Sequence, residues 1–146
     1  MIDRQLLPLA LLYANNTQEI QGRTRLQKLV FLIQKEFNDS ALPGKYNYIP
    51  YDYGPFAKKL YEDLDYLENR GFLKESKETI ENGKVKYNYT LTPEGREHLE
   101  QRPDQKVDRV LQLAEMVKTE FNHLSLPELL DYVYTKYPDY AENSVL

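Results

Sequence analysis

The sequence contains no cysteine, and this absence removes several kinds of chemistry at once. Without a thiol there is no disulfide, no cysteine nucleophile and no cysteine-ligated zinc, which fits a reducing compartment. Histidine is scarce as well: His98 and His123 lie in different predicted helices, with no partner at the i, i+4 spacing of a metal site. Phosphate-binding loops and nucleophile-elbow motifs are also missing. We therefore predict that the protein is not an enzyme and uses no metal and no cofactor.

Long apolar stretches are absent too. No segment approaches the roughly 20 apolar residues that a membrane-spanning helix needs. The first residues lack the positive segment, apolar run and small-residue cleavage site of a secretory signal. We expect a soluble, cytoplasmic protein without a membrane partner.

The chain also lacks the positive net charge that nucleic-acid-binding domains usually carry, because its formal charge is −4. The charge is unevenly distributed, however. Residues 1–59 hold eight Lys/Arg against five Asp/Glu, whereas residues 60–101 hold six against ten. A surface that binds anions is therefore expected mainly in the first two fifths of the chain.

A turn and an amphipathic helix lie at the centre of the sequence. Gly54 can turn the chain, and Pro55 suits the first position of a helix, where its missing N–H has no cost. Apolar residues then recur at helical spacing as far as Gly71, which predicts a helix over residues 55–70. The apolar face comprises Phe56, Leu60, Leu64 and Leu67, and acidic residues cover much of the rest.

A β-hairpin is predicted directly after this helix. Alternation of apolar and polar residues over 85–91 is the pattern of a half-buried strand. Asn82-Gly83 is the favoured pair for a two-residue hairpin turn, since both residues tolerate positive φ. Residues 46–51 are expected to form a short strand against this hairpin, at an edge because Pro50 cannot donate to a ladder.

Further helices are predicted on both sides. The first two are expected near 3–15 and 25–37, the second beginning with a capping box made by Thr24 and Gln27. After the hairpin, three more follow, and two of them start at the capping residues Thr92 and Ser125. The predicted fold class is mostly α with a small β-hairpin (α+β): a winged helix-turn-helix over 1–101 and a C-terminal helical extension over 102–146. The extension is expected to pack on the same domain or at a homodimer interface.

Three segments resemble a known family. They are RTRLQKLVFLI at 23–33, YDYGPF at 51–56 with the helix that follows to Leu67, and LPELLDYVY at 126–134. These segments are similar to the YwgA-like family of small prokaryotic winged-helix proteins. The Leu26–Leu29 and Tyr53–Pro55 elements also resemble the Panacea domain of antitoxin and phage-associated proteins. The resemblance implies a winged helix with transcriptional regulation or antitoxin-type partner binding.

Duplex DNA is the first candidate partner. In a winged helix the helix before the hairpin enters the major groove, while basic side chains at its start and on the wing neutralise phosphates. The acidic residues on that helix oppose deep entry, so only its first turn is expected to reach the bases. The predicted DNA-binding residues are Arg23, Arg25, Lys28, Lys58, Lys59, Lys84 and Lys86.

A protein partner is the alternative. The acidic face of the third helix and the tyrosine-rich segment before it are the kinds of residues that form protein interfaces, where tyrosine is an enriched anchor. The residues predicted for this surface are Tyr46, Tyr48, Tyr51, Glu62, Asp63 and Tyr66.

Overall fold

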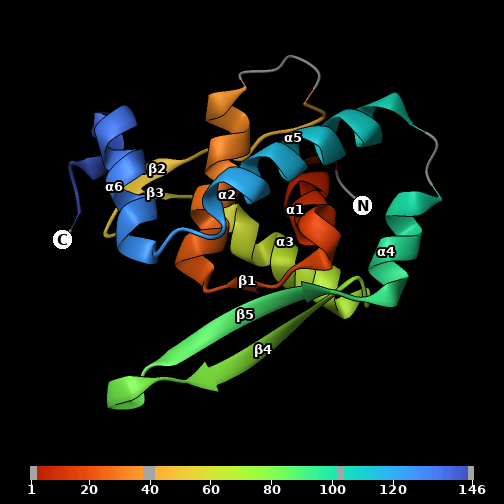
Figure 1. The fold of residues 1–146 in the computed structure, drawn as a ribbon, viewed down its shortest axis with the longest axis horizontal. Coiled ribbons are helices and arrows are strands. Elements are labelled where there is room, and N and C mark those ends of the chain that lie inside the picture. Colours follow the sequence, from red (N-terminus) through yellow and green to blue (C-terminus); the bar gives the residue numbers. More distant parts are fainter. Residues whose placement is uncertain (1–2, 38–41, 102–103, 145–146) are drawn as a thin grey trace.

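The structure is a computed structural model that describes residues 3–37, 42–101 and 104–144, and its fold class is the predicted α+β (Figure 1). Within these residues, six α-helices pack with two small antiparallel sheets. The helices are α1 (Leu6–Thr17), α2 (Arg23–Glu36), α3 (Lys58–Asn69), α4 (Pro93–Glu100), α5 (Gln105–Phe121) and α6 (Leu126–Lys136). The strands are β1 (Ile20–Gln21), β2 (Ile49–Tyr51), β3 (Gly54–Phe56), β4 (Leu73–Thr79) and β5 (Val85–Leu91). Short 3-10 turns lie at Asp3–Gln5, Glu81–Gly83 and Pro138–Ala141.

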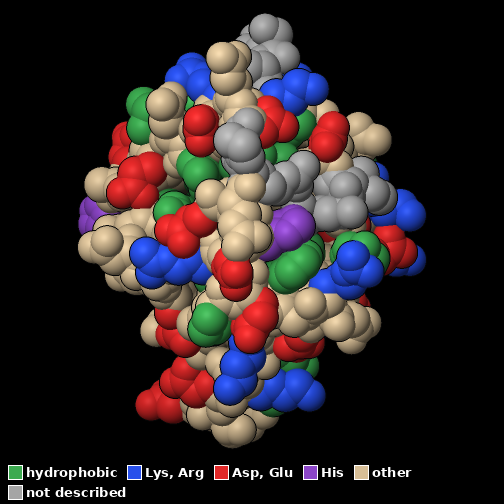
Figure 2. All heavy atoms as spheres, turned by 90° about the vertical axis from the view of Figure 1, so that its right-hand side faces the viewer, with side chains coloured by type: hydrophobic (Ala, Val, Ile, Leu, Met, Phe, Trp, Pro, Cys, Tyr) green, Lys and Arg blue, Asp and Glu red, His purple; other side chains and the backbone are tan. Residues whose placement is uncertain are grey.

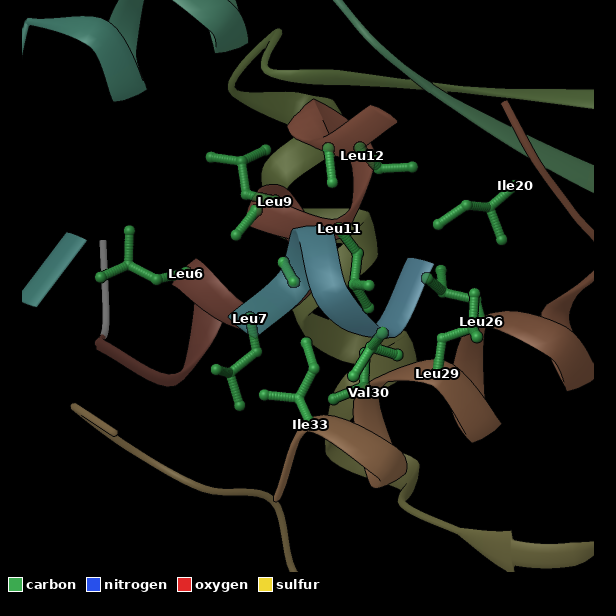
Figure 3. Packing of buried hydrophobic residues seen from close by; sticks show 14 of the residues in the cluster. Leu6, Leu7, Leu9, Leu11, Leu12, Ile20, Leu26, Leu29, Val30 and Ile33 are labelled. Atoms are coloured by element: carbon green, nitrogen blue, oxygen red, sulfur yellow. The ribbon is translucent and has the colours of Figure 1, made fainter. Parts of the chain in front are cut away.

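The hydrophobic core lies where α1, α2 and α5 meet (Figure 3). Leu7 and Leu11 of α1 and Leu29 of α2 are fully buried there. Each such leucine contributes roughly 1.5–3 kcal/mol by leaving water. The helices predicted near 3–15, 25–37 and 55–70 correspond to α1, α2 and α3 and are confirmed, with boundaries that differ by a few residues.

The apolar stripes of the last two helices are buried within the single chain. Val110 and Ala114 of α5 join the core formed by α1 and α2, and Leu129 and Val133 of α6 belong to the same cluster. Packing on the same chain was one of the two predicted arrangements. These stripes therefore no longer support the homodimer predicted through the C-terminal helices.

A buried lysine holds the end of α1. The backbone of Asn15–Thr17 is left-handed, with φ of 53°, 56° and 58°, so the end of α1 departs from helical geometry. Lys118 of α5 reaches across and donates to the carbonyl oxygens of Ala14 (2.8 Å) and Gln18. Burial lowers the pKa of this ammonium to about 8.

The hairpin forms the larger sheet, in which β5 lies between β1 and β4. Asn82 and Gly83 both have positive φ, as the sequence predicts. The prediction of a two-residue turn, however, is wrong. The Ile80 N–H donates to the Lys84 carbonyl at 2.8 Å, so the turn has three residues, Glu81, Asn82 and Gly83. In Figure 1 the hairpin diverges from the helical body toward this turn.

Strands β2 and β3 form a second, two-stranded sheet. Two predictions for this segment are wrong. The segment around Pro50 pairs with Gly54–Phe56 instead of with the hairpin, in a register that places Pro50 opposite Pro55. Pro55 accordingly lies in a strand, and α3 begins later, at Lys58. The Gly-Pro pair thus turns the chain without starting the helix.

The predicted starts of α4 and α6 are confirmed. Thr92 Oγ1 accepts a hydrogen bond from the Gly95 N–H at 3.0 Å. At α6, Ser125 and Glu128 bond to each other's backbone N–H groups, at 3.0 and 3.2 Å, which is a complete capping box.

Asp63 is buried, although the sequence predicts it on the acidic partner-binding face of α3. Only 4% of the residue is exposed, and its carboxylate accepts hydrogen bonds from Arg4 Nε (2.8 Å), Gln5 Nε2 (3.0 Å) and the Tyr46 hydroxyl (2.6 Å). Burial by itself raises the pKa of Asp63, but these three donors outweigh it and the pKa is lowered. The carboxylate thus ties the N-terminus to α3 and to the segment before β2.

Removal of this carboxylate should destabilise the fold. We expect Asp63→Ala to lower the free energy of unfolding by roughly 2–4 kcal/mol, because it removes the acceptor of the buried Tyr46 hydroxyl and the ion-pair partner of the half-buried Arg4. Urea unfolding at neutral pH measures the change. Glu62→Ala, which removes an exposed neighbour, is the control and should shift stability by less than about 0.5 kcal/mol; equal effects of the two variants would contradict the role given to Asp63.

Candidate functional site: a basic, tyrosine-lined groove

A groove of about 920 Å³ lies between the hairpin and the start of α2. One wall is the hairpin, from Ile80 to Tyr87, and the other is the turn between β2 and β3. The floor is the first turns of α2, and Tyr61 of α3 and Leu126 of α6 close it. We call this site the tyrosine-lined groove, because its walls include Tyr51, Tyr53, Tyr61 and Tyr87.

The charge of the groove is of one sign. Its lining residues include five basic side chains and no Asp or Glu. By contrast, acidic and basic side chains are interspersed on the face of the molecule that carries α4 (Figure 2). The five basic residues are Arg23, Arg25, Lys28, Lys84 and Lys86, all of them predicted DNA-binding residues.

Gln27 and Lys28 fix one wall of the groove to its floor. The Gln27 amide donates to the Ala57 carbonyl at 2.9 Å and accepts from the Ala57 N–H at 3.1 Å, and both groups are buried. Lys28 Nζ donates to the Pro55 carbonyl at 3.0 Å. The predicted capping box of Thr24 and Gln27 is therefore wrong, because α2 begins at Arg23 and the Gln27 side chain serves a distant segment.

Gly54 lets the same wall approach α6. Its φ is +92°, and a Cβ built there would lie 2.8 Å from Cε1 of Tyr134. Any other residue would be strained in its backbone and would press against that ring. The turn that carries Tyr51 and Tyr53 is thus supported by α2 on one side and by α6 on the other.

Lys28 is a basic residue with reduced charge. It is only 2% exposed, and burial lowers the pKa of its ammonium to about 7. At neutral pH the group is therefore charged in only part of the molecules. This side chain mainly holds the groove wall, and it is a weaker phosphate ligand than the sequence suggested.

Arg23 is also engaged within the protein. Its guanidinium lies 3.7 Å from the centre of the Tyr87 ring and donates to the Tyr89 hydroxyl at 3.1 Å. Glu75 accepts a further bond at 3.4 Å and balances its charge. Arg23 thus fastens the hairpin to α2.

The remaining three cations are more available to a ligand. Arg25 is half-buried and uses one nitrogen to bond the Asn122 carbonyl at 3.1 Å. Lys84 is exposed at the hairpin turn, and Lys86 makes one exposed bond, to Gln21, at 3.0 Å. An anion in the groove would meet these three side chains.

Lys58 and Lys59 are not part of this site. They line a smaller hollow of about 260 Å³ together with Arg4 and Lys45. Lys59 pairs with Glu62 at 3.1 Å, three residues away. The structure therefore brings five of the seven predicted cations together and places these two elsewhere.

The predicted tyrosine-rich partner surface is only partly exposed. Tyr46 is buried on Asp63, and Tyr48 is half-buried, with its hydroxyl donating to the Gln27 carbonyl at 3.2 Å and its ring against Phe31. Tyr51 and Tyr66 are exposed, as is Glu62. Because Tyr46, Tyr48 and Asp63 face inward, the six residues do not form one continuous surface.

Several residues of the groove are not among those predicted from the sequence. Tyr53, Tyr61 and Tyr87 were not singled out, although Tyr53 lies in the Tyr-Gly-Pro motif and Tyr87 alternates with Lys86 on the strand. Tyr61 lies next to Leu60 on α3, and its place in the groove depends on how α3 meets α2. Only the tertiary arrangement identifies it.

The described part of the chain lacks two further features. Among residues 3–37, 42–101 and 104–144, no three side chains of the His, Asp or Glu type are grouped so as to hold a metal ion. None of the helices in the described part of the chain has the length and apolarity to cross a membrane.

Together, these features define an α+β protein with a basic, tyrosine-lined groove. No protein-family model matches the chain. Over 81 residues, or 56% of the chain, the sequence is 35% identical to a Bacillus subtilis (strain 168) protein that carries the name uncharacterized protein YwgA. The chain spans about half of that relative, 46% of its length. The similarity supports the resemblance to a YwgA-like family, and the similarity to the Panacea domain stays a prediction.

The buried lysines predict a pH-dependent stability. Between pH 7 and 9 the Lys28 amine is mostly neutral in the folded chain and protonated in the unfolded chain, so raising the pH favours folding. We expect Lys28→Met to remove about 1.4 kcal/mol per pH unit from this rise. Urea unfolding at several pH values measures the slope, part of which Lys118 retains above pH 8. Identical slopes for the two proteins would show that Lys28 is charged in the fold.

Proposed function

We propose that this protein is a non-enzymatic DNA-binding regulator with a winged-helix arrangement. The order of its elements supports this proposal: α1, β1, α2, α3 and the hairpin β4–β5 follow one another as in a winged helix, with β1 paired to β5. The hairpin takes the place of the wing. One difference is the connection from α2 to α3, which runs from Glu36 to Lys58 and includes β2 and β3, where a helix-turn-helix has a short turn.

The observation that carries the proposal is the charge of the groove. A chain with net charge −4 collects five basic side chains and no carboxylate along one groove. Phosphate contacts supply most of the affinity of a DNA-binding protein, so such a surface fits a polyanion.

The acidic face of α3 determines how DNA would lie. Glu62, Asp65 and Glu68 are exposed on this helix, and they would repel the phosphates on either side of a major groove. We therefore propose that the hairpin and the start of α2 contact the backbone, through Lys84, Lys86 and Arg25, while α3 stays outside the groove of the duplex.

A protein partner is the second candidate, and the exposed apolar residues favour it. Tyr51, Tyr53, Ile80 and Val85 are each between 41% and 49% exposed, and all of them line the same groove. Interfaces of antitoxin type would use such apolar anchors. Salt dependence separates the two functions, because apolar contacts are much less sensitive to salt than phosphate contacts.

The number of available cations predicts a modest salt dependence. If Arg25, Lys84 and Lys86 each neutralise one phosphate, the log–log slope of affinity against salt should be about −3 for duplex DNA. Fluorescence anisotropy with a labelled duplex over a series of salt concentrations measures this slope. Binding that is absent at low salt would exclude the DNA function and leave the protein partner.

Charge reversal locates the contact surface. We expect Lys84→Glu with Lys86→Glu to weaken duplex binding by about 10- to 100-fold for every sequence, because these contacts position the protein without reading bases. The control, Lys45→Glu with Lys106→Glu, makes the same charge change at exposed sites outside the groove and should have a small effect. Lys58→Glu with Lys59→Glu tests the arrangement predicted from sequence; if it weakens binding more than the groove variant does, DNA lies along α3.

A further inference from the structure

The tyrosine rings of the groove need an explanation that duplex binding does not provide. Tyr51 is 49% exposed and Tyr53 is 47% exposed, which is a large apolar area to leave in water beside five cations. In a duplex the base faces are stacked on one another, and only base edges and the backbone are accessible. Aromatic rings within a groove would gain little from such a ligand.

An unpaired strand, in contrast, exposes its base faces. Proteins that bind single strands combine a basic groove along the backbone with aromatic side chains on which bases stack. Each nucleotide carries one phosphate and one flat ring, and the groove offers cations and tyrosines on facing walls. An acidic peptide would match the charge, but its carboxylate side chains have no flat ring to place on Tyr51 and Tyr53.

The ring of Tyr51 is supported from behind by other aromatic rings. Tyr51 stacks on Phe56, with ring centres 4.8 Å apart and planes 26° apart, so one of its faces is covered and the other is left for a ligand. Phe56 is held in turn by the edge of Tyr61 at 5.4 Å. The nearby backbone of Pro55 and Ala57 is fixed by Lys28 and Gln27, so the Tyr51 ring loses little freedom when a base stacks on it.

The opposite wall supplies the charges. Lys84 and Lys86 come from the hairpin, and Arg25 comes from the floor. At about 920 Å³ the groove has the size of a small-molecule site, which suits a few nucleotides of one strand and not the width of a duplex.

We propose that the tyrosine-lined groove binds an unpaired stretch of nucleic acid, with bases stacked on Tyr51 and Tyr53 and phosphates held by Arg25, Lys84 and Lys86. The proposal rests on the proposed nucleic-acid function and specifies its ligand: a duplex that ends in, or opens into, a single strand. DNA and RNA share this chemistry, and the probes below distinguish them.

The test compares matched oligonucleotides by fluorescence anisotropy at one salt concentration. The probes are a blunt duplex of about 20 base pairs, the same duplex with a DNA or RNA overhang of about eight nucleotides, and the overhang strand alone. We expect at least one overhang probe to bind about tenfold or more tightly than the blunt duplex. The sugar of the preferred overhang identifies the natural strand.

Paired variants isolate the stacking. Tyr51→Leu with Tyr53→Leu keeps apolar bulk but removes the rings, and should reduce overhang binding to the level of the blunt duplex. Tyr51→Phe with Tyr53→Phe keeps the rings and should retain the preference. Tyr66→Leu removes an exposed tyrosine that does not line the groove and should change nothing.

The outcomes separate the two proposals. Equal binding of blunt and overhang probes, or an overhang preference that survives the leucine variant, overturns the single-strand site while duplex binding stands. If no oligonucleotide shows salt-sensitive binding, the proposed function fails and the single-strand site fails with it. Polyglutamate binding that depends on Lys84 and Lys86, without any oligonucleotide binding, would assign the groove to an acidic protein partner.

Discussion

The pairing of the Gln27 amide with the backbone of Ala57 is the interaction on which the rest of the site depends. It joins the middle of one helix to the last residue before another, across a separation of 30 residues. Lys28, the next residue, adds a bond to the carbonyl of Pro55, two residues before Ala57. Together they fix where α3 begins and where the β2–β3 turn stands, and so they hold one wall of the groove against its floor. Removal of the Gln27 amide would leave the N–H and the carbonyl of Ala57 without these hydrogen bonds.

Much of the fold was predictable because its signals are local. Helical periodicity located the helices, and the caps at Thr92 and Ser125 formed as expected. Two of the errors concern residues whose partners are distant in sequence. Thr24 and Gln27 have the spacing of a capping box, yet Gln27 bonds to Ala57. Asp63 has the position of a surface charge, yet Arg4 and Tyr46 enclose it. No local pattern contains these partners.

The candidate site was predictable in part for the same reason. Charge counting along the chain indicated basic residues in the first two fifths, and three of the five cations chosen there do line the groove, where Lys84 and Lys86 of the hairpin join them. How well each cation can bind a phosphate was not predictable. Burial lowers the pKa of Lys28, and Arg23 is paired with the Glu75 carboxylate. The lysines at the start of α3 were grouped with them by analogy to a recognition helix. The strands inserted between α2 and α3 change that geometry and turn these lysines toward another face.

Strand β4 stands at the outer edge of its sheet, and its composition has a consequence for self-association. It reads Leu-Lys-Glu-Ser-Lys-Glu-Thr, and most of its residues are exposed. An edge strand offers unpaired backbone groups that can template pairing with another chain, and charged side chains oppose such contacts. The alternating lysines and glutamates therefore let the hairpin extend into solvent as a soluble element, without recruiting the same strand of a neighbouring molecule into a continuous sheet.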